Sequence, residues 1–152
     1  MRSDLRPRAQ RVAVLAWSLV ACASGAATQR PLTTARVDEP TFALALSAPQ
    51  DVSVGTPTSA GLSIEGRGIY HVNHEYPFRI VLRPTGEVAL TRAELDASTA
   101  TELTPARARF ELPFTCRAPG AHRIEVDVEF ALCTEDACIP QSSTIALTVQ
   151  AR

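Results

Sequence analysis

Lysine is absent from the 152 residues, so all 15 basic side chains are arginines. They are spread along the chain, and 16 acidic residues leave a net charge of −1. A chain without a concentrated basic surface has no electrostatic reason to bind nucleic acid or an acidic membrane surface. We therefore expect no nucleic-acid partner.

The sequence also lacks the signatures of common enzyme classes. It has no glycine-rich phosphate loop, no Ser/His/Asp spacing typical of a hydrolase, and no carboxylate pair placed for acid–base work. Aromatic residues make up only 5% of the chain, whereas proline occurs 11 times. This composition is more typical of a small β-domain with loops than of a helical protein. We expect neither hydrolase nor transferase activity, and no cofactor.

Long hydrophobic runs are missing as well, because the most apolar stretch reaches only from Val12 to Ala21. A helix needs about 20 apolar residues to cross a bilayer. Small residues follow the run, and basic residues precede it at Arg2, Arg6, Arg8 and Arg11. This layout predicts a secretory signal peptide over residues 1–21.

The signal ends in Leu19-Val20-Ala21-Cys22, which resembles the lipobox of bacterial lipoproteins. The resemblance implies that Cys22 is lipidated and becomes the mature N-terminus, anchoring the protein to the membrane. Ala23 in the next position resembles the pattern sorted to the outer membrane. We expect a lipid-anchored protein of the bacterial cell envelope that faces the periplasm. The alternative is plain cleavage at Ala21-Cys22-Ala23, which leaves a soluble periplasmic or secreted protein.

Export places the remaining cysteines in an oxidising compartment, where disulfides persist. With Cys22 used by the lipid, Cys116, Cys133 and Cys138 remain, which allows at most one intramolecular bridge and one free thiol. Cys116 shares the apolar parity of its strand and is predicted to be buried and inert. A third redox thiol or an intermolecular thiol is the alternative. A bridge between Cys133 and Cys138 would close a loop of about six residues and stabilise the fold by about 2 kcal/mol.

The chain after the signal divides into a tether and one domain. Residues 22–40 are small, polar and interrupted by proline, so we predict a flexible tether there. Residues 41–152 are predicted to be all-β. Alternating apolar residues predict strands, the clearest over residues 41–47, 62–65, 78–82, 106–116, 124–130 and 145–149. Residues 91–105 read as a loop with at most one helical turn. Seven or eight short strands favour an immunoglobulin-like β-sandwich.

The last third of the chain resembles a known family. An alternating strand ends in Phe130-Ala131-Leu132-Cys133, a short polar loop follows, and Cys138-Ile139-Pro140 leads into a final apolar strand. This pattern resembles the N-terminal periplasmic domain of the thiol:disulfide interchange protein DsbD family. The stretch from Ile69 to Asn73 is also similar, though less specifically. The resemblance covers roughly residues 40–150.

The resemblance implies an immunoglobulin-like domain whose Cys133 and Cys138 form a redox pair. Its partner would be a thioredoxin-like or other periplasmic thiol–disulfide protein. We expect a stand-alone lipoprotein of this type, because the family's membrane helices and thioredoxin-like domain do not follow. Glu135 and Asp136 lie between the two cysteines and disfavour a thiolate. The alternative is a non-catalytic envelope lipoprotein, a protein-binding sandwich in which the disulfide is purely structural.

One further group of side chains attracts attention, namely His71, His74 and Glu75. Pro77 works against a helix here, and positions i and i+3 of a strand point to opposite faces. We therefore assign no metal site and expect these side chains to make surface or cleft hydrogen bonds.

Overall fold

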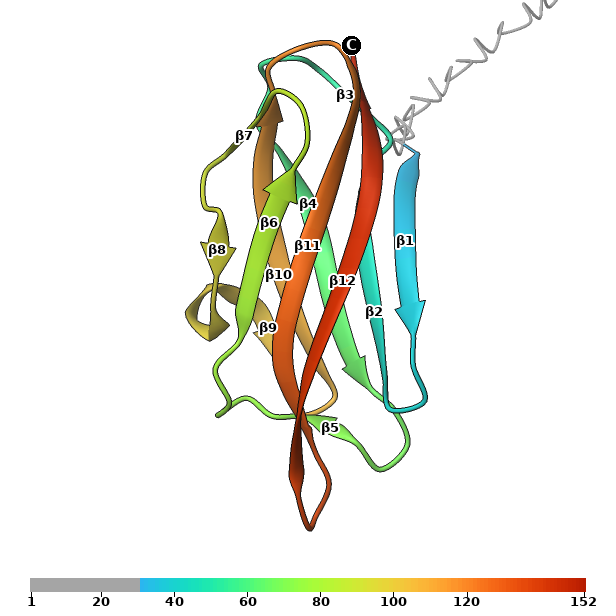
Figure 1. Ribbon diagram of the computed structural model, residues 1–152, viewed down its shortest axis with the longest axis vertical. Helices are drawn as coiled ribbons and strands as arrows, with labels where there is room; N and C mark the ends of the chain where they lie inside the picture. The colour runs from blue at the N-terminus through green and yellow to red at the C-terminus, as the bar shows by residue number, and fades with distance from the viewer. Residues whose placement is uncertain (1–30) are drawn as a thin grey trace, which may run out of the picture.

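The computed structural model describes residues 31–152, which form two β-sheets packed face to face (Figure 1). Within this range the sole helical element is a short 3₁₀ helix, η1 (Ala97–Thr99). The prediction of an all-β domain is therefore confirmed. The predicted signal peptide over residues 1–21, Cys22 and the first part of the predicted tether lie outside the described residues.

Both sheets contain six strands. The first sheet has the order β1 (Leu32–Asp38), β2 (Phe42–Pro49), β4 (Thr58–Gly66), β10 (Arg107–Cys116) and β7 (Val88–Leu90), with β9 (Ala100–Leu103) also paired to β10. The second sheet has the order β3 (Asp51–Val52), β12 (Cys138–Ala151), β11 (Gly120–Cys133), β6 (Arg79–Pro84) and β8 (Glu94–Leu95), with β5 (His71–Val72) also paired to β11.

The chain order of these strands is that of an immunoglobulin domain. Strands β2, β4, β10 and β7 occupy the places of A, B, E and D in one sheet, and β6, β11 and β12 those of C, F and G in the other. All these neighbours pair antiparallel, whereas β3 pairs parallel with the end of β12. The predicted immunoglobulin-like sandwich is confirmed.

The core lies between the two sheets and follows the alternation in the sequence. Along β10, and along β11 as far as Phe130, every second residue is buried, because one face of each strand meets the opposite sheet. The last four residues of β11, from Phe130 to Cys133, are all buried. Large aromatic residues fill the centre. Phe110, Phe114 and Phe130 are completely buried, and Phe42 meets Phe130 edge to face with 5.2 Å between ring centroids.

The predicted tether is wrong for residues 32–38, which form strand β1. This strand pairs antiparallel with β2 from Leu32↔Pro49 to Asp38↔Ala43. Its side chains are at most half-buried because β1 is the edge of its sheet. Backbone hydrogen bonds to β2 hold the strand in place. Such bonds do not depend on the side chains, so the pattern of polar and apolar residues does not reveal them.

Residues 31–152 form twelve strands in place of the predicted seven or eight, because β3, β5, β7 and β8 have only two or three residues each. Residues 91–105 contain η1 as expected, together with β8 and β9. Strands β11 and β12 run further than predicted. Their ends include Cys133 and Cys138, so the two cysteines lie on strands and not in the intervening loop.

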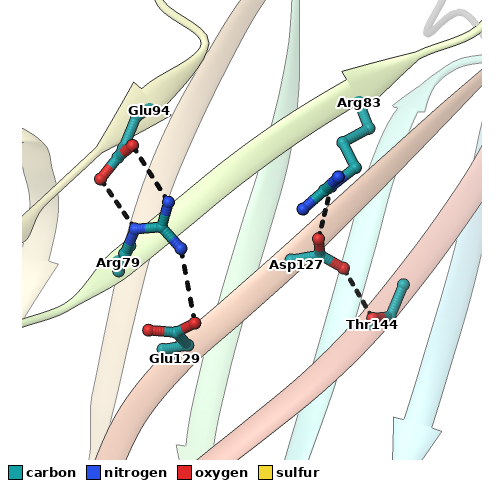
Figure 2. Close-up of polar contacts among 6 residues, drawn as sticks. All are labelled: Arg79, Arg83, Glu94, Asp127, Glu129 and Thr144. Atoms are coloured by element: carbon teal, nitrogen blue, oxygen red, sulfur yellow. Dashed lines mark hydrogen bonds and ion pairs between the residues drawn. The ribbon is translucent and has the colours of Figure 1, made fainter.

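The outer face of the second sheet carries ion pairs between neighbouring strands, as Figure 2 shows. Arg79 of β6 contacts Glu94 at 3.0 Å and Glu129 at 3.5 Å. Beside them, Asp127 accepts hydrogen bonds from the Thr144 hydroxyl at 2.7 Å and from Arg83 Nε at 2.6 Å. The Thr144 hydroxyl, followed by Arg83, holds the pKa of Asp127 below its usual range.

The Asp127 site predicts a pH-dependent contribution to stability. A carboxyl whose folded pKa is depressed stabilises the fold above its unfolded pKa, and this contribution is lost as pH falls through the folded pKa. We expect Thr144→Val to lower the free energy of unfolding by at most about 1 kcal/mol at pH 7, because the site is partly exposed. The loss should shrink at pH 2–3, measured by urea unfolding. Thr148→Val, on the same face of β12, is the matched control. A pH-independent loss at Thr144 contradicts the assignment.

Candidate functional site

The two C-terminal strands form a long hairpin with an unbroken register. Residues pair from Gly120↔Ala151 to Cys133↔Cys138 without a bulge. Figure 1 shows that this hairpin projects beyond the other strands at the end of the molecule near β5. Its turn closes with a hydrogen bond of 2.8 Å from the Thr134 amide to the Ala137 carbonyl. The last register pair of this ladder is therefore the cysteine pair.

Cys133 and Cys138 face each other directly and are joined by a disulfide, with their Cα atoms 4.0 Å apart. The two halves of the bridge differ in exposure. Cys133 is only 4% exposed, whereas Cys138 is an exposed residue. An attacking thiolate must approach a sulfur in line with the bond that breaks. Cys138, the exposed residue of the pair, is therefore the accessible target.

Strand β5 covers the Cys133 side of the bridge. His71 pairs with Cys133, and Val72 pairs with Leu132. After β5 the chain stays on the hairpin, because the Asn73 amide donates to the Ala131 carbonyl at 3.0 Å. One residue from each of three adjacent strands thus lies in a single row, in the order His71, Cys133 and Cys138.

A shallow pocket of about 310 Å³ lies along this row. Residues 71–75 form one wall, and Cys133, Thr134 and Cys138 form the other. The Asn73 side-chain amide donates to Cys138 Sγ at 3.5 Å. Its carbonyl oxygen accepts from the Glu75 amide at 2.8 Å, which fixes the orientation of the side chain and directs the NH₂ group at the sulfur.

The structure brings His71, His74 and Glu75 into this one pocket. Among residues 31–152, however, no group of three or more His, Cys, Asp or Glu side chains is arranged to hold a metal ion. The arrangement supplies hydrogen-bond donors and acceptors beside a disulfide. The same part of the chain contains no helix long and apolar enough to cross a membrane.

Cys116 lies elsewhere, at the end of β10 opposite Val88 of β7. It is 1% exposed, which confirms that it is buried, and burial raises the pKa of its thiol. A buried thiol with a raised pKa forms thiolate poorly and reacts slowly. The Cys116 end of β10 lies near the start of β11, whereas Cys133 is at its finish. Cys116 is not part of the pocket.

The chain matches no family model, and no curated protein is similar to it. Two solved structures are similar in outline. One is a cohesin module from a family 33 glycoside hydrolase of Clostridium perfringens, with 13% identity, covering 75% of this chain and 98% of that chain at a TM-score of 0.45. The other is AggA, the major subunit of aggregative adherence fimbriae type I of Escherichia coli, with 12% identity, coverages of 80% and 95%, and a TM-score of 0.39. At these scores neither similarity bears on function.

The bridge should contribute a modest amount to stability, because its sequence separation is only 5 residues. We expect the Cys133→Ala/Cys138→Ser double variant to lose about 2 kcal/mol of unfolding free energy by the loop-closure relation. Urea unfolding measures the loss, and reduction of the unchanged protein should give the same shift. A loss above about 4 kcal/mol would show that the bridge holds more than its own turn.

The acidic turn should repel anionic thiols. Glu135 and Asp136 are both exposed beside the bridge. We expect Glu135→Gln/Asp136→Asn to raise the rate of reduction by glutathione about twofold to fivefold at low salt. The rate with neutral 2-mercaptoethanol should change far less. Glu87→Gln, at the Cys116 end of the sandwich, shows what the loss of one negative charge far from the bridge does. An equal gain with both thiols contradicts the electrostatic explanation.

Proposed function

We propose that this protein takes part in thiol–disulfide exchange through the Cys133–Cys138 bridge, with Cys138 as the sulfur that a partner attacks. The observation that carries the proposal is the asymmetry of the bridge. Cys138 is an exposed residue that lines an open pocket, while Cys133 is buried and lies between β12 and β5. A bridge that serves only as a staple has no need of an accessible sulfur beside an oriented amide donor.

The geometry supports a two-step exchange. A partner thiolate attacks Cys138 Sγ, the bridge breaks, and its electron pair passes to Cys133 Sγ. The product is a mixed disulfide between the partner and Cys138. A second thiol of the partner then attacks the partner's own sulfur and releases Cys138 as a thiolate, which the Asn73 amide is placed to stabilise. The bridge ends reduced and the partner ends oxidised; the reverse sequence oxidises the pair.

The resemblance of Phe130–Val149 to the N-terminal domain of the DsbD family supports the same reaction and a thioredoxin-like partner. The predicted signal peptide and the lipobox-like position of Cys22 support a location in the cell envelope, with the domain tethered by lipid and facing the periplasm. Both arguments rest on sequence. Neither the family resemblance nor the export signal depends on the geometry of the pocket, and neither conflicts with it.

The second candidate is a non-catalytic envelope lipoprotein whose sandwich binds another protein. It is favoured by the hairpin register, which is continuous up to the bridge and makes it an ordinary cross-strand staple. The reduction potential separates the two functions. A structural disulfide lies below about −300 mV, whereas an exchanging pair lies well above. If the bridge resists reduction by a thioredoxin-like donor, exchange is ruled out and the staple remains.

Single-cysteine variants test which sulfur reacts. In Cys133→Ala the exposed Cys138 is left as a free thiol, and we expect it to form a mixed disulfide with a partner bearing an activated disulfide. In Cys138→Ala the remaining Cys133 is buried, and we expect its trapping rate to be at least about tenfold lower. Non-reducing gels or intact mass measure the adduct. Equal trapping by both variants, or faster trapping of Cys133, contradicts the assigned order of attack.

A further inference from the structure

One wall of the pocket contains a histidine, His71, to which the exchange step gives no role. His71 of β5 lies opposite Cys133 in the sheet register and shares the pocket with it. Side chains of directly opposed residues in an antiparallel pair have Cβ atoms about 4.5–5.5 Å apart. The register therefore puts the His71 imidazole and the Cys133 sulfur on the same face of the sheet as direct neighbours.

We propose that His71 donates a proton to Cys133 Sγ as the bridge breaks. The inference rests on the proposed exchange function and assigns a role within the same site. The sulfur of Cys138 already has a hydrogen-bond donor, which is the side-chain amide of Asn73. The row of side chains therefore places one donor beside each sulfur, an amide at the exposed end and an imidazole at the buried end.

The step balances without any further reagent. A thiolate of the partner forms a bond to Cys138 Sγ, and the Cys133–Cys138 bond breaks. The electron pair of that bond and the proton of the His71 imidazolium meet at Cys133 Sγ, which becomes a neutral thiol. His71 is left neutral and takes a new proton from solvent through the open pocket.

The burial of Cys133 is the physical reason for a donor at this position. A thiolate released at a buried sulfur lacks water to stabilise its charge, so burial penalises the charged form. Transfer of a proton as the bond breaks avoids this penalty. Histidine suits the role because its ring gains and loses a proton near neutral pH.

Several charged side chains lie in or beside the pocket that His71 shares. Its own segment carries His74 and Glu75 in the same pocket, and the turn of the hairpin carries Glu135 and Asp136. Two arginines are near β5 along the chain or in the neighbouring strands, and each is engaged with an acid: Arg107 with Glu65, and Arg67 with Asp38. The charges that are not paired are therefore mainly negative.

The experiment compares the rate of reduction by dithiothreitol across pH for the full chain and for His71→Asn and His71→Gln. Each rate is divided by the concentration of dithiothreitol thiolate, which removes the titration of the attacking thiol. We expect both variants to be slower by about tenfold at pH 6. This effect is small for acid catalysis, because a thiolate is already a fair leaving group without a proton. At pH 9 the variants and the unchanged protein should react at the same rate.

His74→Asn is the comparison variant, since His74 lines the same pocket but does not pair with Cys133. The proposal is overturned if the unchanged protein and the His71 variants have the same rate at pH 6 after division by the thiolate concentration. An equal loss in His74→Asn also overturns it, as does a loss that persists unchanged at pH 9. Urea unfolding of the two His71 variants confirms that the hairpin is intact.

Failure of this inference and failure of the exchange function give different results. Excess dithiothreitol reduces even a bridge of low potential, so the pH profile can be measured in either case. A potential below about −300 mV with a normal His71 effect removes the exchange function and keeps the proton donor. A potential well above about −300 mV without a His71 effect removes the proton donor and keeps the exchange function.

Discussion

The antiparallel register between β11 and β12 is the constraint on which the site depends. It runs without a bulge from Gly120↔Ala151 to Cys133↔Cys138. Because side chains alternate with a period of two, this register decides at once which residues enter the core and which meet across the outer face. Phe130 and Leu132 are thereby buried between the sheets, and the two cysteines are brought opposite each other. A slip of one residue would separate the cysteines and expose the core face.

The short strand β5 turns a symmetric pair of cysteines into an asymmetric one. Cys133 and Cys138 occupy equivalent places in the hairpin, yet only Cys133 has a further strand on its other side. Cys133, between β12 and β5, is 4% exposed, whereas Cys138 is an exposed residue. The same segment supplies His71 and Asn73, so the cover of the buried sulfur and the polar wall of the pocket come from one short stretch of chain.

The strands with one buried and one solvated face were predictable from sequence, whereas the segments held by backbone pairing alone were not. Alternation marked β10 and β11, because burial against the opposite sheet leaves a period of two. The sequence of β1 predicts a tether instead, since an edge strand with half-exposed side chains resembles a polar linker. Strand β5 has two residues, too few to show any period. The pairing of His71 with Cys133 is a long-range contact that no local pattern encodes.

The position of the bridge also decides what its reduction does to the fold. A cross-link that closes a loop of about 100 residues stabilises a domain by nearly 5 kcal/mol, whereas one that closes a turn contributes about 2 kcal/mol. Here the bridge lies at the end of the ladder, outside the core between the sheets, and the ladder from Gly120 to Leu132 holds the hairpin without it. Small domains have total stabilities of about 5–15 kcal/mol, so the sandwich should stay folded when the bridge is open. An exchanging pair must survive its own reduction, and a disulfide at the tip of a fully registered hairpin meets that requirement.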